Sequence, residues 1–554
     1  MKIKEINSLA KLKACQQDWE AILERSKNNN PFLEFAWIET WWEVFGHEYE
    51  MYIICAYAGS EPIAFLPLMK EKGSFITTIR MVSLPQSNYM DIVAEDDMKQ
   101  TCWQEMLDYV MARNPNTLFL LSGFLDSSRS AGLMRQYAEL NAISFYNYQV
   151  PAPYFDYLSE DSGLLMKKRL KNHGVDRKEK RLKKAGAVSF RPIGEEHFED
   201  MFLVHQKRWD AKWDVSGFDE EPAKSFFHDV ALTKGQALKP IVYGLFFEET
   251  LIAFLYGMAC RDRFLFYRLA HDDDFGIYSP GKMILNHSIV SASKDDAALF
   301  DFTIGEEKYK HEWKTADDTV YHFLLMNRPS LIASVIFHFH KLKQRMVVQL
   351  KRHYSIVLFK RNTIGKWKKY ASDKKLFLRK CFGLLQAGRR RLFHADVRFL
   401  YRKELSANSS IPSSLERVSL QTVLARRDTG QEVKEIVDRL YKGQKGYCHK
   451  ENHSDIVWVS EKGLDGENFS LPARSLAIEG PLSGRCMEGL EAIIAGDFPE
   501  AEQLFYMSKR KSKQLEEDGF RFVKAYRTVS ILGYAFGGGE RSLPTEHRNL
   551  LEEK

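Results

Sequence analysis

The residues best suited to chemistry lie close together between positions 279 and 313. The stretch begins with Ser279, Pro280, Gly281 and Lys282. Ser and Pro favour the first positions of a helix, and Gly lets a ligand approach the backbone closely. The free amides and the dipole of a first helical turn attract anions such as phosphate, and the lysine adds positive charge. This stretch therefore predicts an anion-binding turn at the start of a helix.

Elements of an α/β fold have to hold this turn in place. The aromatic run at 263–269 is β-prone, and the short apolar run at 300–303 is typical of a buried strand. A helix is expected between them, beginning at Pro280. The predicted order is strand, Gly-containing turn, helix and strand, which places the turn at one end of a sheet.

The stretch resembles the acyl-CoA-binding core of the GNAT acyltransferase superfamily. More narrowly, it resembles the CelD-like branch found beside cellulose and exopolysaccharide biosynthesis, which is related in fold to the Fem peptidyltransferases. The residues that carry this resemblance are Tyr278 to Lys282, Phe300 to Lys310, and Trp313. The usual pyrophosphate loop of the superfamily, Q/R-x-x-G-x-G/A, is absent, and Ser279 to Lys282 stand in its place.

The resemblance implies acetyl-CoA or another acyl-CoA as co-substrate. Acyl transfer then needs a polarised thioester carbonyl, a nucleophile that loses a proton and a thiolate that gains one. In GNAT folds a backbone N–H on the splayed fourth strand polarises the carbonyl. The resemblance therefore assigns cofactor binding to Tyr267, Arg268, Leu269, Ser279, Gly281, Lys282 and Lys310.

Four side chains are candidates for catalysis. Tyr309 is the candidate acid for the leaving thiolate, with a packing tyrosine as the alternative. Asp301 lies between two phenylalanines, so burial would raise its pKa towards the range of a base; the alternative is a structural carboxylate bonded to a neighbouring turn. Glu306 is a candidate base or substrate anchor. His205 is a candidate base because an ordinary histidine side chain titrates near neutral pH, although a lone helical histidine also serves in packing.

Candidate substrate contacts are Trp209, Lys308 and Trp313. Trp209 follows His205 by four positions, hence on the same helix face. Lys308 suits phosphates, with a solvated lysine as the alternative. The segment 167–184 contains ten Lys and Arg against two acids. It is either a contact for an anionic substrate or a solvated face.

Composition excludes several classes of protein. The seven cysteines are scattered without a CxxC pair, which favours a reducing cytosol over a disulfide scaffold. The histidines form no metal-like motif, so no metal is expected. The first residues lack the apolar run of a signal peptide, and no apolar run approaches the roughly 18 residues needed to span a membrane.

The net charge of +6 conceals a split along the chain. Residues 328–404 contain 21 Lys and Arg against three acids, a balance of +18 that leaves −12 for the remainder. Apolar residues recur at helical spacing within this segment. It is expected to lie on an anionic membrane surface, with nucleic-acid binding or docking on the chain's own acidic domains as alternatives.

The sequence predicts mixed α/β sheets in tandem GNAT-like domains. The expected boundaries are a degenerate first GNAT-like domain at 1–150, an acyltransferase domain at 151–327, a basic helical connector at 328–405, a C-terminal α/β domain at 411–536 and a tail at 537–554. The C-terminal domain closes with a helix and two strands around Ser512 and Phe520, a pattern that resembles a third GNAT-like unit.

The function expected from the resemblance is acyl transfer, acetyl above all, from CoA to an amine or hydroxyl of a sugar or envelope-polymer precursor. The acceptor would be a small molecule or a lipid-linked sugar, and the location cytoplasmic or peripheral at the inner face of the membrane. The alternatives are a Fem-like aminoacyltransferase that uses aminoacyl-tRNA and a non-catalytic scaffold for a polysaccharide synthase.

Overall fold

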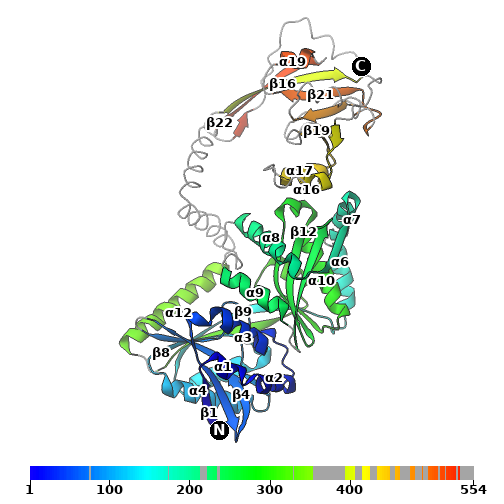
Figure 1. The fold of residues 1–554 in the computed structure, drawn as a ribbon. Helices are drawn as coiled ribbons and strands as arrows, with labels where there is room; N and C mark the ends of the chain where they lie inside the picture. Colours follow the sequence, from blue (N-terminus) through cyan, green and yellow to red (C-terminus); the bar gives the residue numbers. More distant parts are fainter. Residues whose placement is uncertain are drawn as a thin grey trace. The chain divides into compact units, whose positions relative to one another are not determined.

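The computed structural model describes most of the chain. The described residues are 1–73, 76–172, 174–211, 221–233, 237–327, 330–352, 394–405, 415–424, 433–449, 456–461, 475–480, 490, 494, 497–508, 512–517, 520–531 and 534–536. The chain divides into two compact units, Met1–Lys366 and Trp367–Lys554 (Figure 1). The expected tail at 537–554 lies outside the described residues.

A sheet of eleven strands runs through the first unit. Its order is β10 (Val188–Pro192), β11 (Leu238–Phe247), β12 (Thr250–Cys260), β13 (Arg263–His271), β14 (Leu299–Asp301), β9 (Ser144–Asp156), β15 (Ala316–Asn327), β8 (Thr117–Leu125), β6 (Thr77–Met81), β5 (Leu68–Lys72) and β2 (Glu50–Met51). A smaller sheet has the order β1 (Lys2–Ile6), β3 (Ile53–Ala58), β4 (Glu61–Leu66) and β7 (Val93–Ala94). The mixed α/β class predicted from the sequence is confirmed.

The first unit has two halves, which correspond to the expected domains 1–150 and 151–327. These halves exchange a strand at the centre of the sheet. β9 follows the first half in sequence but pairs with β14, whereas β15 ends the second half and pairs with β8. β9 and β15 also pair with each other, antiparallel. On either side of them lies a parallel pair, β13 with β14 and β6 with β8. The strand order is therefore symmetric about the β9–β15 pair.

This exchange changes the expected domain boundary. Position 150 falls inside β9, and the sheet continues without a break from 1–150 into 151–327. Pairing with the other half satisfies the backbone groups that an edge strand would leave open. The two halves thus form one unit.

Helices of the first half pack around tryptophan side chains. They are α1 (Leu9–Lys13), α2 (Gln16–Arg25), α3 (Phe35–Phe45), α4 (Lys99–Arg113) and α5 (Ser130–Leu140). The helical spacing of aromatic residues from Phe35 predicts α3, and there Trp37 and Trp41 are buried. Two β-prone runs on either side of Gly59 predict a hairpin, which is present as β3 and β4.

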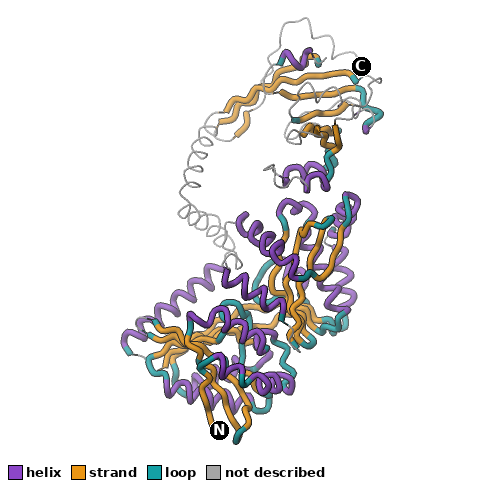
Figure 2. Tube along the Cα trace, in the orientation of Figure 1, coloured by secondary structure: helices purple, strands orange, loops and turns teal. Residues whose placement is uncertain are grey.

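The second half has helices on both sides of its strands (Figure 2). They are α6 (Ser162–Asn172), α7 (Val175–Ala185), α8 (Phe198–Ala211), α9 (Glu221–Leu232), α10 (Pro280–Lys294) and α11 (Lys308–Trp313). Tyr243 bonds Ser291 of α10, and Tyr256 bonds the Phe227 carbonyl of α9. Tyr243 lies opposite Leu255, the neighbour of Tyr256, so α10 and α9 cover opposite faces.

The sequence pattern predicts one basic helix over 164–185, but the structure has two. α6 and α7 are separate, and Gly174 between them has a φ of 61°. A left-handed residue ends a helix, and glycine adopts that conformation without steric cost.

The second unit repeats the strand order of the second half. Its sheet runs β17 (Leu415–Arg417), β18 (Lys445–His449), β19 (Ile456–Ser460), β20 (Ser475–Glu479), β21 (Gln503–Ser508), β16 (His394–Glu404), β22 (Arg521–Ile531) and β23 (Tyr534–Phe536). β20 and β21 are parallel, and the strand that precedes the repeat lies next to β21, as β9 lies next to β14. Its described helices are α16 (Leu420–Leu424), α17 (Val433–Tyr441) and α19 (Lys513–Glu517).

The connector expected at 328–405 is divided between the units. Its first described part is α12 (Leu331–Arg352), which packs on the first unit, whereas β16 is a central strand of the second. A wholly helical connector is therefore wrong at 394–404. The cause is strand pairing with β21 and β22, which local composition does not reveal.

Candidate functional site

The two parallel strands β13 and β14 part at the point where β14 ends. Their ladder begins at Arg263 and Leu299 and stops at Leu265 and Asp301, while β13 continues to His271. A gap therefore opens beside the second half of β13. This is the end of the sheet at which the sequence placed the anion-binding turn.

A β-bulge lies at Tyr267, beside this gap. Arg268 pairs with Tyr256 and Phe266 with Gly257, which leaves Tyr267 as the extra residue of β13. A bulge takes backbone groups of one residue out of the ladder. The Tyr267 hydroxyl donates to the Gln86 carbonyl at 2.7 Å, which anchors the bulged strand to the first half. An amide of this kind is suited to stabilising an oxyanion.

The start of α10 lies against the end of β13. A Cβ on Gly281 would come within 2.8 Å of His271 Nδ1 and 3.3 Å of Leu269 Cδ2. Only glycine lets the helix approach the strand this closely. Pro280 occupies the first helical position, as the sequence predicts.

Ser279 does not cap α10 with its side chain, contrary to expectation. It stands at the N-cap position with a φ of 64°, and its side chain makes no capping bond. Its hydroxyl instead accepts a hydrogen bond from Lys178 Nζ at 2.8 Å. The left-handed backbone explains the difference, because capping side chains act from an extended residue.

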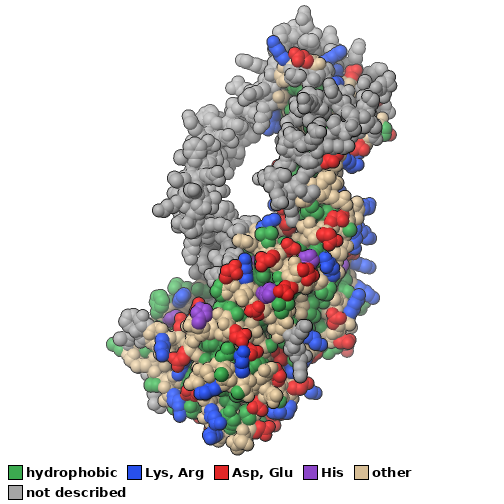
Figure 3. All heavy atoms as spheres, in the orientation of Figure 1, with side chains coloured by type: hydrophobic (Ala, Val, Ile, Leu, Met, Phe, Trp, Pro, Cys, Tyr) green, Lys and Arg blue, Asp and Glu red, His purple; other side chains and the backbone are tan. Residues whose placement is uncertain are grey.

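Positive charge gathers around this helix start. Lys178 belongs to α7, and Figure 3 shows Lys and Arg side chains along the edge formed by α6 and α7. Glu179 ties α7 to α10 through His287 at 3.2 Å. Lys282 Nζ lies 3.3 Å from Glu312. The basic segment therefore lies beside the turn that was predicted to bind phosphate.

The loop after β14 and helix α11 carry the predicted acid and its neighbours. Tyr309 packs edge-on against Phe266, with ring centroids 6.1 Å apart, so it lies beside the gap. Burial raises the pKa of its hydroxyl. Glu306 and Lys308 are exposed.

Two other predicted residues on α11 are engaged inside the protein. Lys310 is buried, and its Nζ donates to the Ile304 carbonyl at 2.7 Å and lies 3.1 Å from Glu307. Burial lowers the pKa of its ammonium group, while Glu307 acts in the opposite direction. Trp313 is 2% exposed and packs against Phe155. The contacts of both side chains are therefore internal, and they fix α11 against the rest of the first unit.

His205 and Trp209 lie on α8, on one helix face as expected. Their ring centroids are 5.7 Å apart, and His205 is 1% exposed with Phe254 as a further ring neighbour. Arg208, which lies between these two residues in the sequence, forms an ion pair with Asp273 in the segment before α10. His205 is thus buried in the core beside β12, whereas Trp209 is half-buried.

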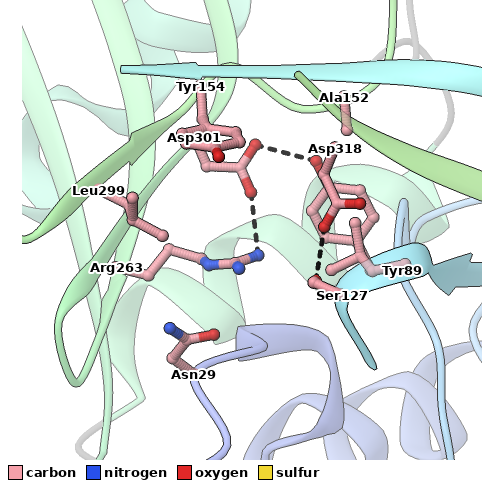
Figure 4. Close-up of a pocket in the computed structure, with 10 residues that line it drawn as sticks. Asn29, Tyr89, Ser127, Ala152, Tyr154, Arg263, Leu299, Asp301 and Asp318 are labelled. Atoms are coloured by element: carbon pink, nitrogen blue, oxygen red, sulfur yellow. Dashed lines mark hydrogen bonds and ion pairs between the residues drawn. The ribbon is translucent and has the colours of Figure 1, made fainter. Parts of the chain in front are cut away.

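Asp301 faces away from α10, into a cavity of about 280 Å³ (Figure 4). Phe300, the residue before it, stacks on Phe264 on the α10 side, so strand alternation turns Asp301 to the other face. The cavity is lined by Asn29, Tyr89, Leu125, Ser127, Ala152, Tyr154, Arg263, Leu299, Asp301 and Asp318. Both halves of the first unit contribute to it.

The Asp301 carboxylate is held by three donors. It accepts from Tyr89 Oη at 2.9 Å, from Arg263 at 3.1 Å and from the Thr303 amide at 2.7 Å. Burial has the largest effect and raises the pKa of Asp301, although each of these donors acts to lower it. Burial also raises the pKa of Tyr89. Figure 4 shows Arg263 and Tyr89 both directed at the carboxylate.

A second carboxylate lies on the same wall of the cavity. Asp318 Oδ2 accepts from Ser127 Oγ at 2.5 Å, and its Oδ1 accepts from the Thr319 amide. Among the lining residues, the two carboxylates exceed the one guanidinium of Arg263 by one negative charge. The cavity is therefore better suited to a cationic or hydroxyl-bearing group than to an anion.

Sequence reasoning missed Tyr89, Ser127 and Asp318 as site residues, and it included Arg263 only as part of the β-prone run at 263–269. One signal was available: a carboxylate between two apolar aromatics is expected to need a buried partner. Nothing in the local pattern identifies that partner. Among the described residues, no cluster of His, Cys, Asp and Glu could hold a metal ion, and no helix has the length and apolar character needed to cross a membrane.

Comparison with known proteins agrees with part of this assignment. Residues 168–311 match the family described as acetyltransferase (GNAT) domain, which supports a GNAT-type acyltransferase domain in this part of the chain. No curated protein matches the sequence. The CelD-like branch stays a prediction.

Several solved structures are similar at low identity. FemX is 10% identical with a TM-score of 0.44, over 61% of this chain and 100% of its own. A tandem GNAT protein from the clavulanic acid biosynthesis pathway is 9% identical with a TM-score of 0.34, over 58% and 98%. L-PGS from Bacillus licheniformis is 11% identical with a TM-score of 0.35, over 59% and 96%. Similarity at this level does not identify a substrate.

Proposed function

We propose that the first unit transfers an acyl group from an acyl-CoA, acetyl-CoA above all, to an amine or hydroxyl of a sugar or envelope-polymer precursor. The observation that carries the proposal is the bulge at Tyr267, which lies beside the gap between β13 and β14 and next to the start of α10. It lies within the residues that match the acetyltransferase domain. Lys178 supplies positive charge for the CoA phosphates. The exposed Lys282 would do so by exchanging its ion pair with Glu312 for a phosphate, an exchange that burial disfavours for the Lys99–Asp91 pair at the start of α4.

The chemistry follows from these positions. The acceptor attacks the thioester carbonyl, whose oxygen takes up negative charge and is stabilised by the backbone N–H at the bulge. A bond from the acceptor to the acyl carbon forms, and the carbon–sulfur bond breaks. The departing CoA thiolate accepts a hydrogen bond from Tyr309. The proton that the acceptor loses passes to Glu306, to Asp301 or to water.

Tyr309 acts on the thiolate mainly as a hydrogen-bond donor. Its pKa is raised above the usual value for tyrosine, and a thiol has a pKa of about 8.5. Complete proton transfer from the tyrosine to sulfur is therefore uphill, whereas a hydrogen bond to the forming thiolate lowers the barrier without it.

The cavity at Asp301 is proposed to receive the acceptor. It lies on the face of the sheet opposite α10, and Asp301 is the residue at which β13 and β14 part. The donor from the α10 side and the acceptor from the other side would then meet at the gap. The excess negative charge of the lining favours an amine over an anionic acceptor.

Calorimetric titration of the full chain with acetyl-CoA tests the donor. Gly281→Asp should abolish binding, because it adds bulk against His271 and negative charge at the phosphate site. Gly132→Asp on α5 is the matched control, because a Cβ at Gly132 meets nothing within 4 Å. Loss of binding in Gly281→Asp alone supports the site.

Two results would overturn the proposal. One is failure of acetyl-CoA and of longer acyl-CoAs to bind the parent chain. The other is a Gly281→Asp variant that binds acetyl-CoA as well as the parent does and has an unchanged near-ultraviolet circular dichroism spectrum. Tight RNA binding with a steep salt dependence would instead favour the aminoacyl-tRNA alternative.

A further inference from the structure

Helix α12 presents an apolar stripe to solvent. Its inner side packs on the first unit, where Ala333 and Phe337 join a cluster with Leu118, Leu324 and Met326 of β8 and β15. Five large apolar side chains point the other way, with exposed fractions from 49% to 84%: Leu331, Val335, Phe339, Leu342 and Met346. Figure 3 shows hydrophobic side chains at the surface along α12.

The five residues form a narrow stripe. At about 100° per residue they fall within an arc of roughly 80° on the helix. Isolated exposed apolar residues are ordinary, but a continuous row along one helix face indicates an interaction surface.

Basic residues flank this stripe on both sides. Residues 330–352 contain five Lys and Arg and no Asp or Glu. By the same helical spacing, Lys343 lies roughly 40° beyond one edge of the stripe and Arg345 roughly 40° beyond the other. Arg345 lies over the Tyr146 ring at 5.4 Å, which holds it at that edge.

We propose that α12 lies in the surface of an anionic lipid bilayer, with the stripe buried among the acyl chains and the flanking cations at the headgroups. The positive charge beside the stripe favours a lipid bilayer over the other two candidate partners, a second copy of the chain and nucleic acid. Two copies of this helix face would bring Lys343 and Arg345 together without an acidic partner, which disfavours self-association. Nucleic acid would satisfy the cations but leave the apolar stripe in water.

Co-sedimentation with vesicles tests the proposal on the full chain. The parent should bind vesicles of phosphatidylcholine with phosphatidylglycerol, and bind phosphatidylcholine alone far less. Phe339→Ser together with Leu342→Gln should lower the partition constant by about a hundredfold, because each apolar side chain buried in lipid contributes about a factor of ten. Lys343→Glu should reduce binding to the anionic vesicles only.

A matched control uses apolar residues exposed elsewhere in the first unit. Leu140 and Leu158 are 76% and 78% exposed, so Leu140→Gln with Leu158→Gln makes a similar loss of apolar surface away from α12. This control should bind vesicles as the parent does.

Equal recovery with both kinds of vesicle, or a stripe variant that binds as the parent does, would overturn the proposal. So would sedimentation velocity that shows a dimer in the parent and a monomer in the stripe variant, because the stripe would then be covered by a second copy. Faster proteolysis of the stripe variant in the absence of lipid would indicate that the chain covers the stripe itself.

Discussion

The hydrogen bond from Tyr89 to Asp301 should stabilise the first unit measurably. Tyr89→Phe removes one donor from a carboxylate that is 5% exposed, while Arg263 and the Thr303 amide continue to bind it. A hydrogen bond to a charged group contributes about 1.5–3 kcal/mol. We expect the free energy of unfolding to fall by that amount. Asp301→Asn should cost about 3–5 kcal/mol, because it leaves a buried guanidinium without its charged partner.

Tryptophan fluorescence during urea unfolding provides the assay. Eight of the ten tryptophans lie in the first unit, so the signal reports mainly on its unfolding. The two substitutions should not be additive, since after Asp301→Asn the tyrosine donates only to a neutral amide oxygen and the charge-assisted part of its hydrogen bond is already lost. Tyr146→Phe is the control, because the Tyr146 hydroxyl makes no hydrogen bond to a described residue. If Tyr89→Phe cost no more than Tyr146→Phe, or if the double variant were additive, the reasoning would be refuted.

Three further predictions concern the donor site. Tyr309→Phe removes a hydrogen-bond donor to the forming thiolate and should lower turnover on the order of 10²–10³ with little change in acetyl-CoA affinity, and unchanged turnover with chemistry limiting would make it a packing residue. Lys178→Ala should weaken acetyl-CoA binding about tenfold by calorimetry, whereas the exposed Lys180→Ala should not. Glu179 has its pKa lowered to about 2 from 4.5, first of all by His287. Its contribution to stability is therefore present above pH 4.5 and lost as the pH falls towards 2; Glu179→Gln should flatten thermal stability in that window, and an unchanged profile would contradict this.

The sequence predicted those helices and strands that depend on residues close together in the chain. Helix α3 follows from aromatic spacing, the β3–β4 hairpin from a Gly59 turn, and the start of α10 from Pro280. The strand exchange has no such signal, because β9 and β14 are far apart in sequence and pair through backbone groups that every residue carries. Similarly, the helical pattern that ends near Lys27 predicts one long helix, whereas Lys2–Ile6 pairs with β3 as a strand.

In the candidate site too, some residues could be predicted from the sequence and others could be found only from the structure. Gly281 at the helix start, Tyr309 beside the gap and the backbone of Tyr267 were found from composition and resemblance. The partners of Asp301 were not, because Tyr89 is separated from it by 212 residues and reaches it only through the fold. Lys178 was recognised as part of a basic segment, but its contact with the helix start depends on how α7 packs.

The first half also contains a parallel pair of strands with a helix between them in sequence. The segment around Met90, however, fills the gap beside this pair. β6 and β8 lie parallel with α4 between them in sequence, as β13 and β14 do with α10. There the Met90 amide donates to the Gly123 carbonyl at 2.9 Å, and a Cβ on Gly123, which has a φ of +99°, would come within 2.7 Å of that nitrogen.

Charge at the start of α4 is also already neutralised. Lys99 is buried and bonded to Asp91 at 2.8 Å, so a phosphate would have to compete with a carboxylate in place. The segment that fills this gap also reaches the second half, where the Gln86 carbonyl accepts from Tyr267 and Tyr89 donates to Asp301. The first half therefore supports the bulge and the cavity of the second, and within the first unit the geometry favours a single donor site, between β13 and β14.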